Sequence, residues 1–403
     1  MSYKIRLFHL CLIATVLPAP AQLVVIRPAS PVSIPVQVDG NSPFFWYEGE
    51  VHFLTSTGPH PVIGGGPSQL QFSWWDGVVI VPADRLPIWI EAAWVDSDGT
   101  VYGWYHHEPE GLCPGSGLTA PKIGAVVSQD GGRTFFDLGL ILTSGDPVDC
   151  GAKNGFFGGG HGDFSVILDR DRSYFYFFFT NYGGDLAGQG VGVARMAFDH
   201  RSAPVGAVHK YFDGGWTQPG QGGRVQPVFP ARVSWQRSDA DSFWGPAVHW
   251  NTALESYVIL MNRACCKPGW PQEGIYASFN ADMSNPQGWT SPLRILRDIG
   301  FEPGFYPQVL GMGPGETDTL AGKTARLFIH GRSMWEISFE KTGSQEGPGN
   351  HPGDDGAGTP LPVRDGQSLT PVRAADRTDR CPKRYPGLGC RESSGAIPPA
   401  ASR

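Results

Sequence analysis

The sequence has few charged residues and no segment in which positive charge accumulates. Charged side chains make up 17% of the 403 residues, and 31 Lys and Arg stand against 38 Asp and Glu, for a net charge of -7. A protein that binds nucleic acid needs Lys and Arg grouped on one face, so this balance argues against a nucleic-acid partner. Neutral or weakly polar ligands fit the composition better.

Long apolar runs are also lacking, apart from one near the start of the chain. Lys4 and Arg6 precede the apolar segment 7–17, and small residues follow at 19–21, which predicts a secretory signal peptide over residues 1–21. The apolar segment is about half the length of the roughly 20 residues that a membrane span needs. We therefore expect an exported protein, secreted or periplasmic, with no membrane insertion after cleavage of the signal.

Cysteine is scarce, and its spacing follows no metal-binding pattern. Of seven cysteines, Cys11 lies in the expected signal peptide, which leaves six in an oxidising compartment. The pairs favoured by proximity are Cys113 with Cys150 and Cys381 with Cys390. The adjacent Cys265 and Cys266 are not expected to bridge without strain. No zinc-type spacing recurs, so no metal–thiolate site is expected.

Turn-forming residues are abundant. The chain has 55 Gly and 36 Pro, which favours many turns and few helices, while 40% hydrophobic and 12% aromatic residues suffice for a large core. Short runs of β-branched and aromatic residues between these turns are strand signals. One large all-β domain is the economical interpretation.

A meander of short apolar runs is repeated along the chain. Its clearest copy, 161–196, opens with the glycine-rich carboxylate segment Gly160-His161-Gly162-Asp163 and continues as three runs separated by polar turns. Related units cover 88–127, 244–296 and 306–339, and a less regular unit covers 34–84. Four-stranded sheets repeated around an axis make a propeller, so the sequence predicts a five-bladed β-propeller over residues 22–340.

The last part of the chain differs in composition. Residues 341–403 are dominated by Gly, Pro, Asp, Ser and Arg, with almost no aromatic side chains. Such a segment cannot bury enough apolar surface to offset its ordering entropy. We expect a disordered, low-complexity tail without catalytic content.

The segment Ser128-Gln129-Asp130-Gly131-Gly132-Arg133-Thr134-Phe135 resembles the Asp-box of neuraminidase-type repeats. In this pattern Ser and Asp cap a tight hairpin, glycine takes the left-handed position, and the aromatic ring packs beneath. It falls between the third and fourth expected strands of a blade. The motif is therefore expected to be structural and remote from any active site.

The blade pattern resembles the clan of five-bladed β-propeller glycoside hydrolases that includes arabinanases, β-xylosidases, invertases and levansucrases. It rests on a carboxylate or Gly-Pro at the mouth of each inner strand, with Trp or Tyr nearby, and extends over Phe45 to Phe339. Three phrases are similar to an uncharacterised family of exported bacterial propeller proteins: 102–109, 244–252 and 272–276. The resemblance implies a fold directly and an activity by analogy.

The resemblance also implies that carboxylates converge at the mouth of the central funnel. Glycosidic cleavage needs two carboxyl groups about 5 to 10 Å apart, one protonated and one ionised. Asp163 is expected as a supporting carboxylate, Glu91 as base or nucleophile, and Glu273 as the acid. We expect Glu91 and Asp163 to lie within about 10 Å of each other. The alternative for each is a structural carboxylate, for example one paired with Arg263.

A second set of polar and aromatic residues is expected on the surrounding rim, where it would bind substrate. These residues are His106, His107, Glu108, Trp244, His249, Arg263, Tyr306 and Gln308. No cofactor and no catalytic metal are expected, and a structural Ca²⁺ on the propeller axis is an open alternative.

Three functional hypotheses follow. The first is a secreted glycoside hydrolase-like protein that acts on an oligo- or polysaccharide through the funnel carboxylates. The second is a non-catalytic, glycan-binding β-propeller, and the third is a structural or protein-binding propeller. The sequence leaves open whether the protein is an enzyme.

Overall fold

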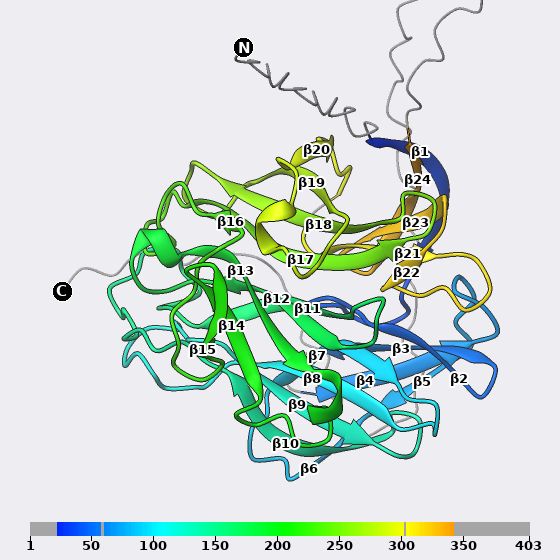
Figure 1. Ribbon diagram of the computed structural model, residues 1–403, viewed down its shortest axis with the longest axis horizontal. Helices are drawn as coiled ribbons and strands as arrows, with labels where there is room; N and C mark the ends of the chain where they lie inside the picture. The colour runs from blue at the N-terminus through cyan, green and yellow to red at the C-terminus, as the bar shows by residue number, and fades with distance from the viewer. Residues whose placement is uncertain (1–21, 58–59, 302–303, 342–403) are drawn as a thin grey trace, which may run out of the picture. The chain divides into compact units, whose positions relative to one another are not determined.

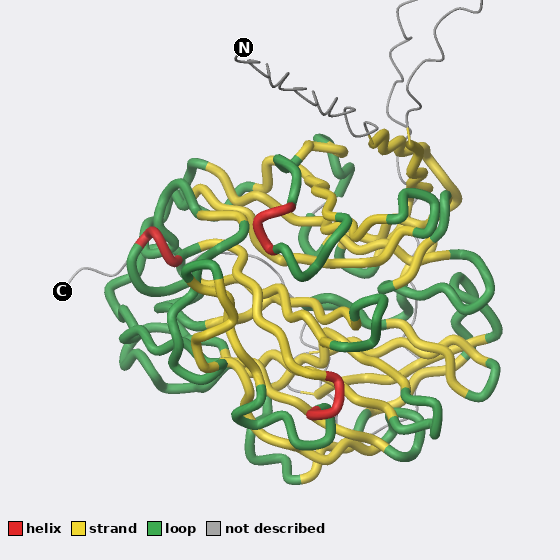
Figure 2. Tube along the Cα trace, in the orientation of Figure 1, coloured by secondary structure: helices red, strands yellow, loops and turns green. Residues whose placement is uncertain are grey.

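Five sheets account for almost all of the regular structure in the computed structural model, which describes residues 22–57, 60–301 and 304–341 (Figure 1). The expected signal peptide and nearly all of the expected tail lie outside these residues. Within them, helix is limited to three short 3₁₀ turns, Leu186–Gly188, Phe198–His200 and Pro286–Gly288 (Figure 2). None of the helical turns described is long and apolar enough to cross a membrane.

Blades I and II form the first part of the ring. Blade I contains β2 (Phe44–Tyr47), β3 (Glu50–Thr57), β4 (His60–Gly66) and β5 (Trp74–Gly77). Blade II contains β7 (Ile88–Val95), β8 (Val101–His107), β9 (Lys122–Ser128) and β10 (Thr134–Leu142), and β6 (Val79–Val81) pairs in parallel with β10. One detail corrects the expected first unit, 34–84: β6 pairs with the neighbouring blade.

Blades III and IV follow the same plan. Blade III contains β11 (His161–Leu168), β12 (Tyr174–Asn181), β13 (Gly190–Ala197), β14 (Val208–Phe212) and β15 (Gly215–Pro219), and β16 (Phe229–Pro230) pairs with β13. Blade IV contains β17 (Asp241–Asn251), β18 (Ser256–Cys265), β19 (Gln272–Asn280) and β20 (Leu293–Leu296), and β22 (Leu320–Ala321) pairs with β17. Both predicted meanders are confirmed.

Blade V is built from both ends of the described chain. Its strands are β21 (Pro307–Gly311), β23 (Thr324–Ile329), β24 (Arg332–Lys341) and the outer strand β1 (Gln22–Ser33). In Figure 1 the blue β1 lies along the orange β24, with Val24 opposite Phe339 and Ile26 opposite Ile337. The predicted unit, 306–339, did not include β1, whose sequence contains two prolines. Pairing of the two ends closes the ring.

The core lies between adjacent blades. The inner strands β2, β7, β11, β17 and β21 contact one another in this order, and Gln308 of blade V bonds to the backbone N–H of Ser42 ahead of β2. A buried apolar cluster fills each of the five interfaces; between blades II and III it includes Trp104, Phe164 and Phe177. A fully buried aromatic side chain contributes about 1.5–3 kcal/mol. The five-bladed β-propeller fold is confirmed.

Two disulfides are present among the described residues. Cys113 and Cys150 are joined, as expected from their proximity. Cys265 and Cys266, for which a bridge was expected only at the cost of strain, are also joined. The chain turns sharply at the end of β18, where Cys266 has a φ of 74°, and this turn brings the two Sγ atoms together. Cys381 and Cys390 lie outside the described residues.

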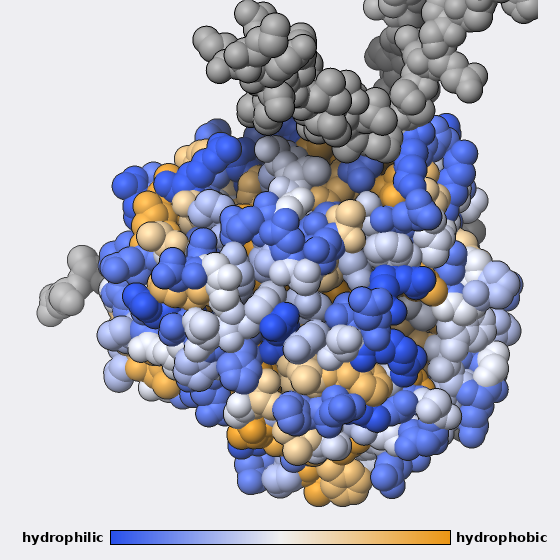
Figure 3. Space-filling view, in the orientation of Figure 1, coloured by the Kyte–Doolittle hydropathy of each residue, from blue (hydrophilic) through white to orange (hydrophobic). Residues whose placement is uncertain are grey.

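The surface is mixed in character. The face drawn in Figure 3 is mainly hydrophilic, with smaller apolar areas scattered over it. Exposed large apolar side chains include Val79 and Val81 of β6 and Phe136 of β10. These three residues lie on paired strands, with Phe136 directly opposite Val81, so they belong to one part of the surface of blade II.

Candidate functional site

A pocket opens where the five inner strands meet. Each blade supplies at least one residue to it: Asp39 ahead of β2, Glu91 of β7, Asp163 of β11, Trp244 of β17 and Tyr306 ahead of β21. The complete lining also contains Trp89, His106, Glu108, Phe156, Phe157, Gly269, Trp270 and Phe305. The cavity has a volume of about 250 Å³. This volume is near the lower end of the range for small-molecule sites.

Irregular pairing directs two carboxylates into the pocket. The ladder between β7 and β8 shifts register at Glu91, between Ile90 and Ala92. The ladder between β11 and β12 shifts at Asp163, where φ is 41°. Bulges re-aim a side chain, and a positive φ at a non-glycine residue costs of order 1–3 kcal/mol, which makes such strain common at functional sites.

Glu91 is buried and connects two blades. Its Oε2 accepts the backbone N–H of Phe164 over 2.8 Å, and its Oε1 lies 3.3 Å from Nδ1 of His106. Burial raises the pKa of Glu91, and the contacts with His106 and Phe164, which favour the ionised form, oppose this rise. Both oxygens are therefore engaged by the protein.

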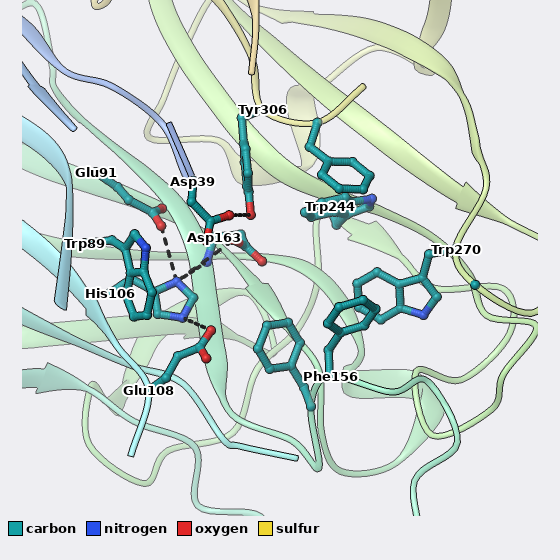
Figure 4. A pocket seen from close by; sticks show the side chains of 13 residues that line it. Asp39, Trp89, Glu91, His106, Glu108, Phe156, Asp163, Trp244, Trp270 and Tyr306 are labelled. Carbon is teal, nitrogen blue, oxygen red and sulfur yellow. Dashed lines mark hydrogen bonds and ion pairs between the residues drawn. The ribbon is translucent and has the colours of Figure 1, made fainter. Parts of the chain in front are cut away.

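His106 lies between carboxylates. Its Nδ1 faces Glu91, and its Nε2 lies 3.2 Å from Oε1 of Glu108 (Figure 4). The backbone N–H of Asp163 approaches Nδ1 at 3.2 Å, which favours the neutral ring. Burial lowers the pKa of His106, but Glu108 and Glu91 outweigh burial and hold that pKa well above its usual value. The pairing of His106 with these two carboxylates therefore favours the imidazolium over the neutral ring.

Asp163 combines burial with a position at the pocket wall. The hydroxyl of Tyr182 donates to its Oδ2, and its Oδ1 lies 3.9 Å from Nδ1 of His106. Burial raises the pKa of Asp163 to about 7; Glu91 adds to the rise, while His106 and Tyr182 oppose it. Near neutral pH, this carboxyl group can therefore hold or release a proton.

Asp39 is a pocket carboxylate that the sequence interpretation missed. It is exposed, and Tyr306 donates a hydrogen bond to its Oδ1 over 3.4 Å. The next residue, Gly40, has a φ of 137°, and a Cβ there would lie 2.9 Å from Oε1 of Glu91. Asp39-Gly40 precedes an inner strand just as Gly162-Asp163 opens one. This signal was available, but the irregular first unit obscured it.

Aromatic side chains form the other side of the pocket. Figure 4 shows Trp244, Trp270 and Phe156 facing the carboxylate side. Trp244 and Trp270 lie edge to face at 5.8 Å, and Phe156 lies 4.9 Å from Trp270. No Lys or Arg is among the lining residues. Among the aromatic lining residues, the sequence had predicted Trp244 and Tyr306 as site residues. It missed Trp89, Phe156, Phe157, Trp270 and Phe305, most of which lie in loops between strands.

The structure does not bring Glu273 and Arg263 into the pocket. Glu273 Oε2 lies 2.5 Å from Nη1 of Arg263, its Oε1 lies 3.1 Å from Arg294, and Tyr276 donates to it over 2.7 Å. Arg263 is also paired with Asp241 at 2.8 Å. The expected acid role of Glu273 and the expected binding role of Arg263 are therefore corrected: these charges neutralise one another beside β19.

Three other expected rim residues also lie outside the pocket lining. His107 Nδ1 lies 3.2 Å from the carbonyl of Pro87. His249 is buried in β17 against Phe339, and burial lowers its pKa to about 3. Gln308 bonds to the backbone of Ser42 through both its oxygen and its nitrogen. Their packing and backbone contacts describe structural roles.

His161, at the start of β11, belongs to a separate buried pair. Its Nε2 lies 2.9 Å from Nζ of Lys210, which donates to the carbonyls of Thr143 and Gly223 over 2.8 Å each. Burial lowers the pKa of Lys210 to about 7. Lys210 therefore links the end of blade II to the mouth of blade III.

Two clusters of the described residues have metal-type donors within 4.8 Å of one another. The first comprises Asp241, Cys265 and Cys266. Asp241 is paired with Arg263 and the two cysteines form a disulfide, so these donors are already engaged. The second comprises Glu91, His106 and Asp163. Ion pairing and hydrogen bonding already explain this second cluster. The axial Ca²⁺ stays a prediction; a small cavity on the axis has Asn41 Oδ1 and Ser165 Oγ without hydrogen-bond partners among the described residues.

No family model and no curated protein matches the chain. Solved structures do match. A thermostable family-43 glycoside hydrolase gives a TM-score of 0.46 at 12% identity, with 80% of this chain and 100% of that chain covered. An arabinanase from Bacillus subtilis gives a TM-score of 0.43 at 12% identity, with 76% of this chain and 95% of that chain covered. An endo-arabinase from Bacteroides thetaiotaomicron gives a TM-score of 0.43 at 10% identity, with 78% of this chain and 98% of that chain covered. The chain is similar to these propeller glycoside hydrolases in fold.

Proposed function

We propose that the protein is a glycoside hydrolase whose general acid is Asp163 and whose second catalytic carboxylate is Asp39. The observation that carries this proposal is the contrast between the two groups. Asp163 is buried, with its pKa raised to about 7, whereas Asp39 is exposed in the same pocket. Two carboxyl groups in unlike environments are what glycosidic cleavage requires.

In the first step, protonated Asp163 donates its proton to the glycosidic oxygen as the bond from that oxygen to the anomeric carbon breaks. Asp39 supplies the ionised carboxylate, which either deprotonates the attacking water or bonds to the anomeric carbon. Tyr306 holds Asp39 through its hydroxyl. Proton release by a carboxyl group of pKa near 7 suits catalysis at neutral pH.

Glu91, His106 and Glu108 act as positioning residues in this proposal. Glu91 binds the N–H of Phe164 and so fixes the bulge that carries Asp163. His106, held between Glu91 and Glu108, places positive charge 3.9 Å from Asp163. Together with Tyr182, this charge limits the rise of the Asp163 pKa that burial and Glu91 cause.

The lining also suggests the substrate class. Aromatic rings stack on the C–H faces of sugar rings, and opposite the carboxylates the exposed ring of Phe156 lines the pocket together with the largely buried Trp244 and Trp270. No Lys or Arg lines the pocket, and His106 is already paired with Glu91 and Glu108, so no unpaired cation there would neutralise an acidic sugar. The proposed substrate is therefore a neutral oligo- or polysaccharide, in keeping with export as expected from the N-terminal sequence.

The test is hydrolysis of a panel of neutral polysaccharides and aryl glycosides, including arabinan, galactan and xylan, with polygalacturonate as the acidic comparison. Wild type should release reducing sugar from at least one neutral substrate. Asp163→Asn and Asp39→Asn should each lower kcat/KM at least 10²-fold, as expected for loss of a catalytic proton donor or acceptor. The matched control is Asp241→Asn, a carboxylate outside the pocket.

A non-catalytic glycan-binding protein is the second candidate. The aromatic wall favours it, because stacking alone would hold a sugar without chemistry. Binding of a neutral oligosaccharide that Trp244→Ala weakens, with no turnover in wild type, would establish this alternative and exclude the hydrolase.

A further inference from the structure

A second groove lies between blades I and II, away from the proposed catalytic pocket. It is lined by Tyr47, Glu48, Glu50, His52, Trp74, Trp75, Asp76, Asp130 and Arg133. β2 connects the two sites: Asp39 precedes this strand at the pocket, and Tyr47 ends it at the groove. The four residues of β2 alone span about 13 Å. The groove and the proposed catalytic pocket are therefore separate sites, and they share no lining residue.

One side of the groove is a fixed aromatic framework. Nε1 of Trp74 donates to Glu50 over 3.1 Å, and the guanidinium of Arg133 lies 5.0 Å above the indole. His52, which is buried, contacts Trp74 edge to face at 5.0 Å. These contacts hold Trp74 in one orientation. The neighbouring Trp75 then projects from a rigid strand.

Trp75 has no such contacts. Its side chain is 53% exposed, and no ring contact, cation–π contact or hydrogen bond ties it to the rest of the described chain. A large exposed indole beside a groove offers a flat face for stacking. The aromatic platform is therefore free for a ligand.

Hydrogen-bond acceptors flank this platform. Glu48 makes no hydrogen bond or ion pair with the described residues, although its charge acts on His52, and Asp76 uses only Oδ1, which accepts the N–H of Gly77 over 2.7 Å. Asp130 differs, because its Oδ1 is occupied by Ser128 and by the N–H groups of Arg133 and Thr134. Free carboxylate oxygens accept hydrogen bonds from hydroxyl groups.

We propose that this groove is a second carbohydrate-binding site, which holds a neutral polysaccharide chain against the face of Trp75. A sugar presents an apolar C–H face, which can stack on the indole, and hydroxyl groups, which can donate hydrogen bonds to Glu48 and Asp76. Glu48, Glu50, Asp76 and Asp130 outnumber the single Arg133, so the groove disfavours acidic polymers. The choice of a sugar as ligand rests on the proposed function; the geometry of the groove does not.

The experiment is affinity electrophoresis in gels that contain arabinan, galactan, xylan or polygalacturonate, with Asp163→Asn as the background so that the polymer is not degraded. At least one neutral polymer should retard this protein, and polygalacturonate should not. Trp75→Ala should weaken retardation about tenfold, the loss expected for one aromatic stack. Trp75→Tyr should keep most of it. The matched control is Phe136→Ala, which removes a 51% exposed ring outside the groove.

Equal retardation of the background protein and its Trp75→Ala form would overturn the proposal, as would an absence of retardation by every neutral polymer. Binding of polylysine or polygalacturonate in place of neutral polymers would also overturn it, in favour of a charged partner. Trp75→Ala in the otherwise wild-type chain should leave kcat/KM on a small soluble glycoside unchanged. Failure of the groove proposal is thereby distinguished from failure of the proposed hydrolase activity.

Discussion

The backbone N–H of Phe164 donates to Oε2 of Glu91 over 2.8 Å, so the bulge of β11 is tied to the bulge of β7. Asp163 immediately precedes this N–H and has a φ of 41°. A strained backbone persists only where its surroundings hold it in place. We infer that Glu91 holds Asp163 at the pocket wall from the neighbouring blade.

Glu91→Leu should therefore destabilise the protein by on the order of 3 kcal/mol, because it leaves the Phe164 N–H and Nδ1 of His106 without their carboxylate partner in a buried site. Glu91→Gln keeps an acceptor for Phe164 and should cost less, about 1 kcal/mol. The free energy of unfolding in urea measures both. Equal losses for the two variants would show that the hydrogen bond to Phe164 contributes nothing.

Tyr182→Phe removes the hydroxyl that donates to Asp163. This bond favours the ionised carboxylate, so its loss should raise the pKa of Asp163 further above about 7. The acid must be protonated to act; the alkaline limb of kcat/KM should therefore move upward by on the order of one pH unit.

The matched control is Tyr276→Phe, which removes a comparable hydroxyl from Glu273 outside the pocket. It should leave the pH profile in place. A limb that moves downward in Tyr182→Phe, or stays where it is, would be inconsistent with Asp163 as the proton donor.

Glu273→Gln tests the corrected role of that residue. Glu273 is paired with Arg263 and Arg294 and is not part of the pocket lining, so kcat/KM should stay within about threefold of wild type. The free energy of unfolding should fall by about 1 kcal/mol, since these pairs are partly exposed. A 10²-fold loss of activity would restore Glu273 as the acid.

Lys210 should make stability depend on pH above neutrality. Its pKa is lowered to about 7 in the folded protein, against about 10.4 for an unperturbed lysine. Between these two pKa values the unfolded chain binds more protons at Lys210 than the folded protein does. The contribution of Lys210 to the free energy of unfolding therefore rises with pH, by up to about 1.4 kcal/mol per pH unit, and is lost as the pH falls to 7. Lys210→Met should flatten the rise between pH 7 and pH 9.5 in urea unfolding. The same slope in both proteins would contradict the lowered pKa.

The sequence predicted the fold well because strand signals are local. Runs such as 174–180 and 256–263 alternate with turn residues, and each became a strand of a blade. The closing strand β1 could not be recognised, since its partner β24 is more than 300 residues away in sequence and only the pairing makes it a strand. Local patterns carry no information about such distant partners.

The candidate site was predictable only where it belongs to the inner strands. Glu91 and Asp163 lie on inner strands, at the fourth position of β7 and the third of β11, and the structure brings their oxygens within 4.8 Å, closer than the expected limit of about 10 Å. Trp270 and Phe156 lie in loops whose paths no periodic pattern describes. Glu273 also shows the limit of the approach: it was expected as the acid, but Arg263 and Arg294 determine its surroundings.

The most direct test of the proposed acid compares leaving groups in Asp163→Asn. Once the panel has identified the sugar, kcat/KM is measured on its 2,4-dinitrophenyl glycoside, whose leaving group needs no proton, and on the corresponding methyl glycoside or oligosaccharide, whose leaving group does. If Asp163 is the general acid, Asp163→Asn should lose at least 10²-fold more activity on the poor leaving group than on the activated one. Equal losses on both substrates would contradict the assignment of Asp163 as the proton donor.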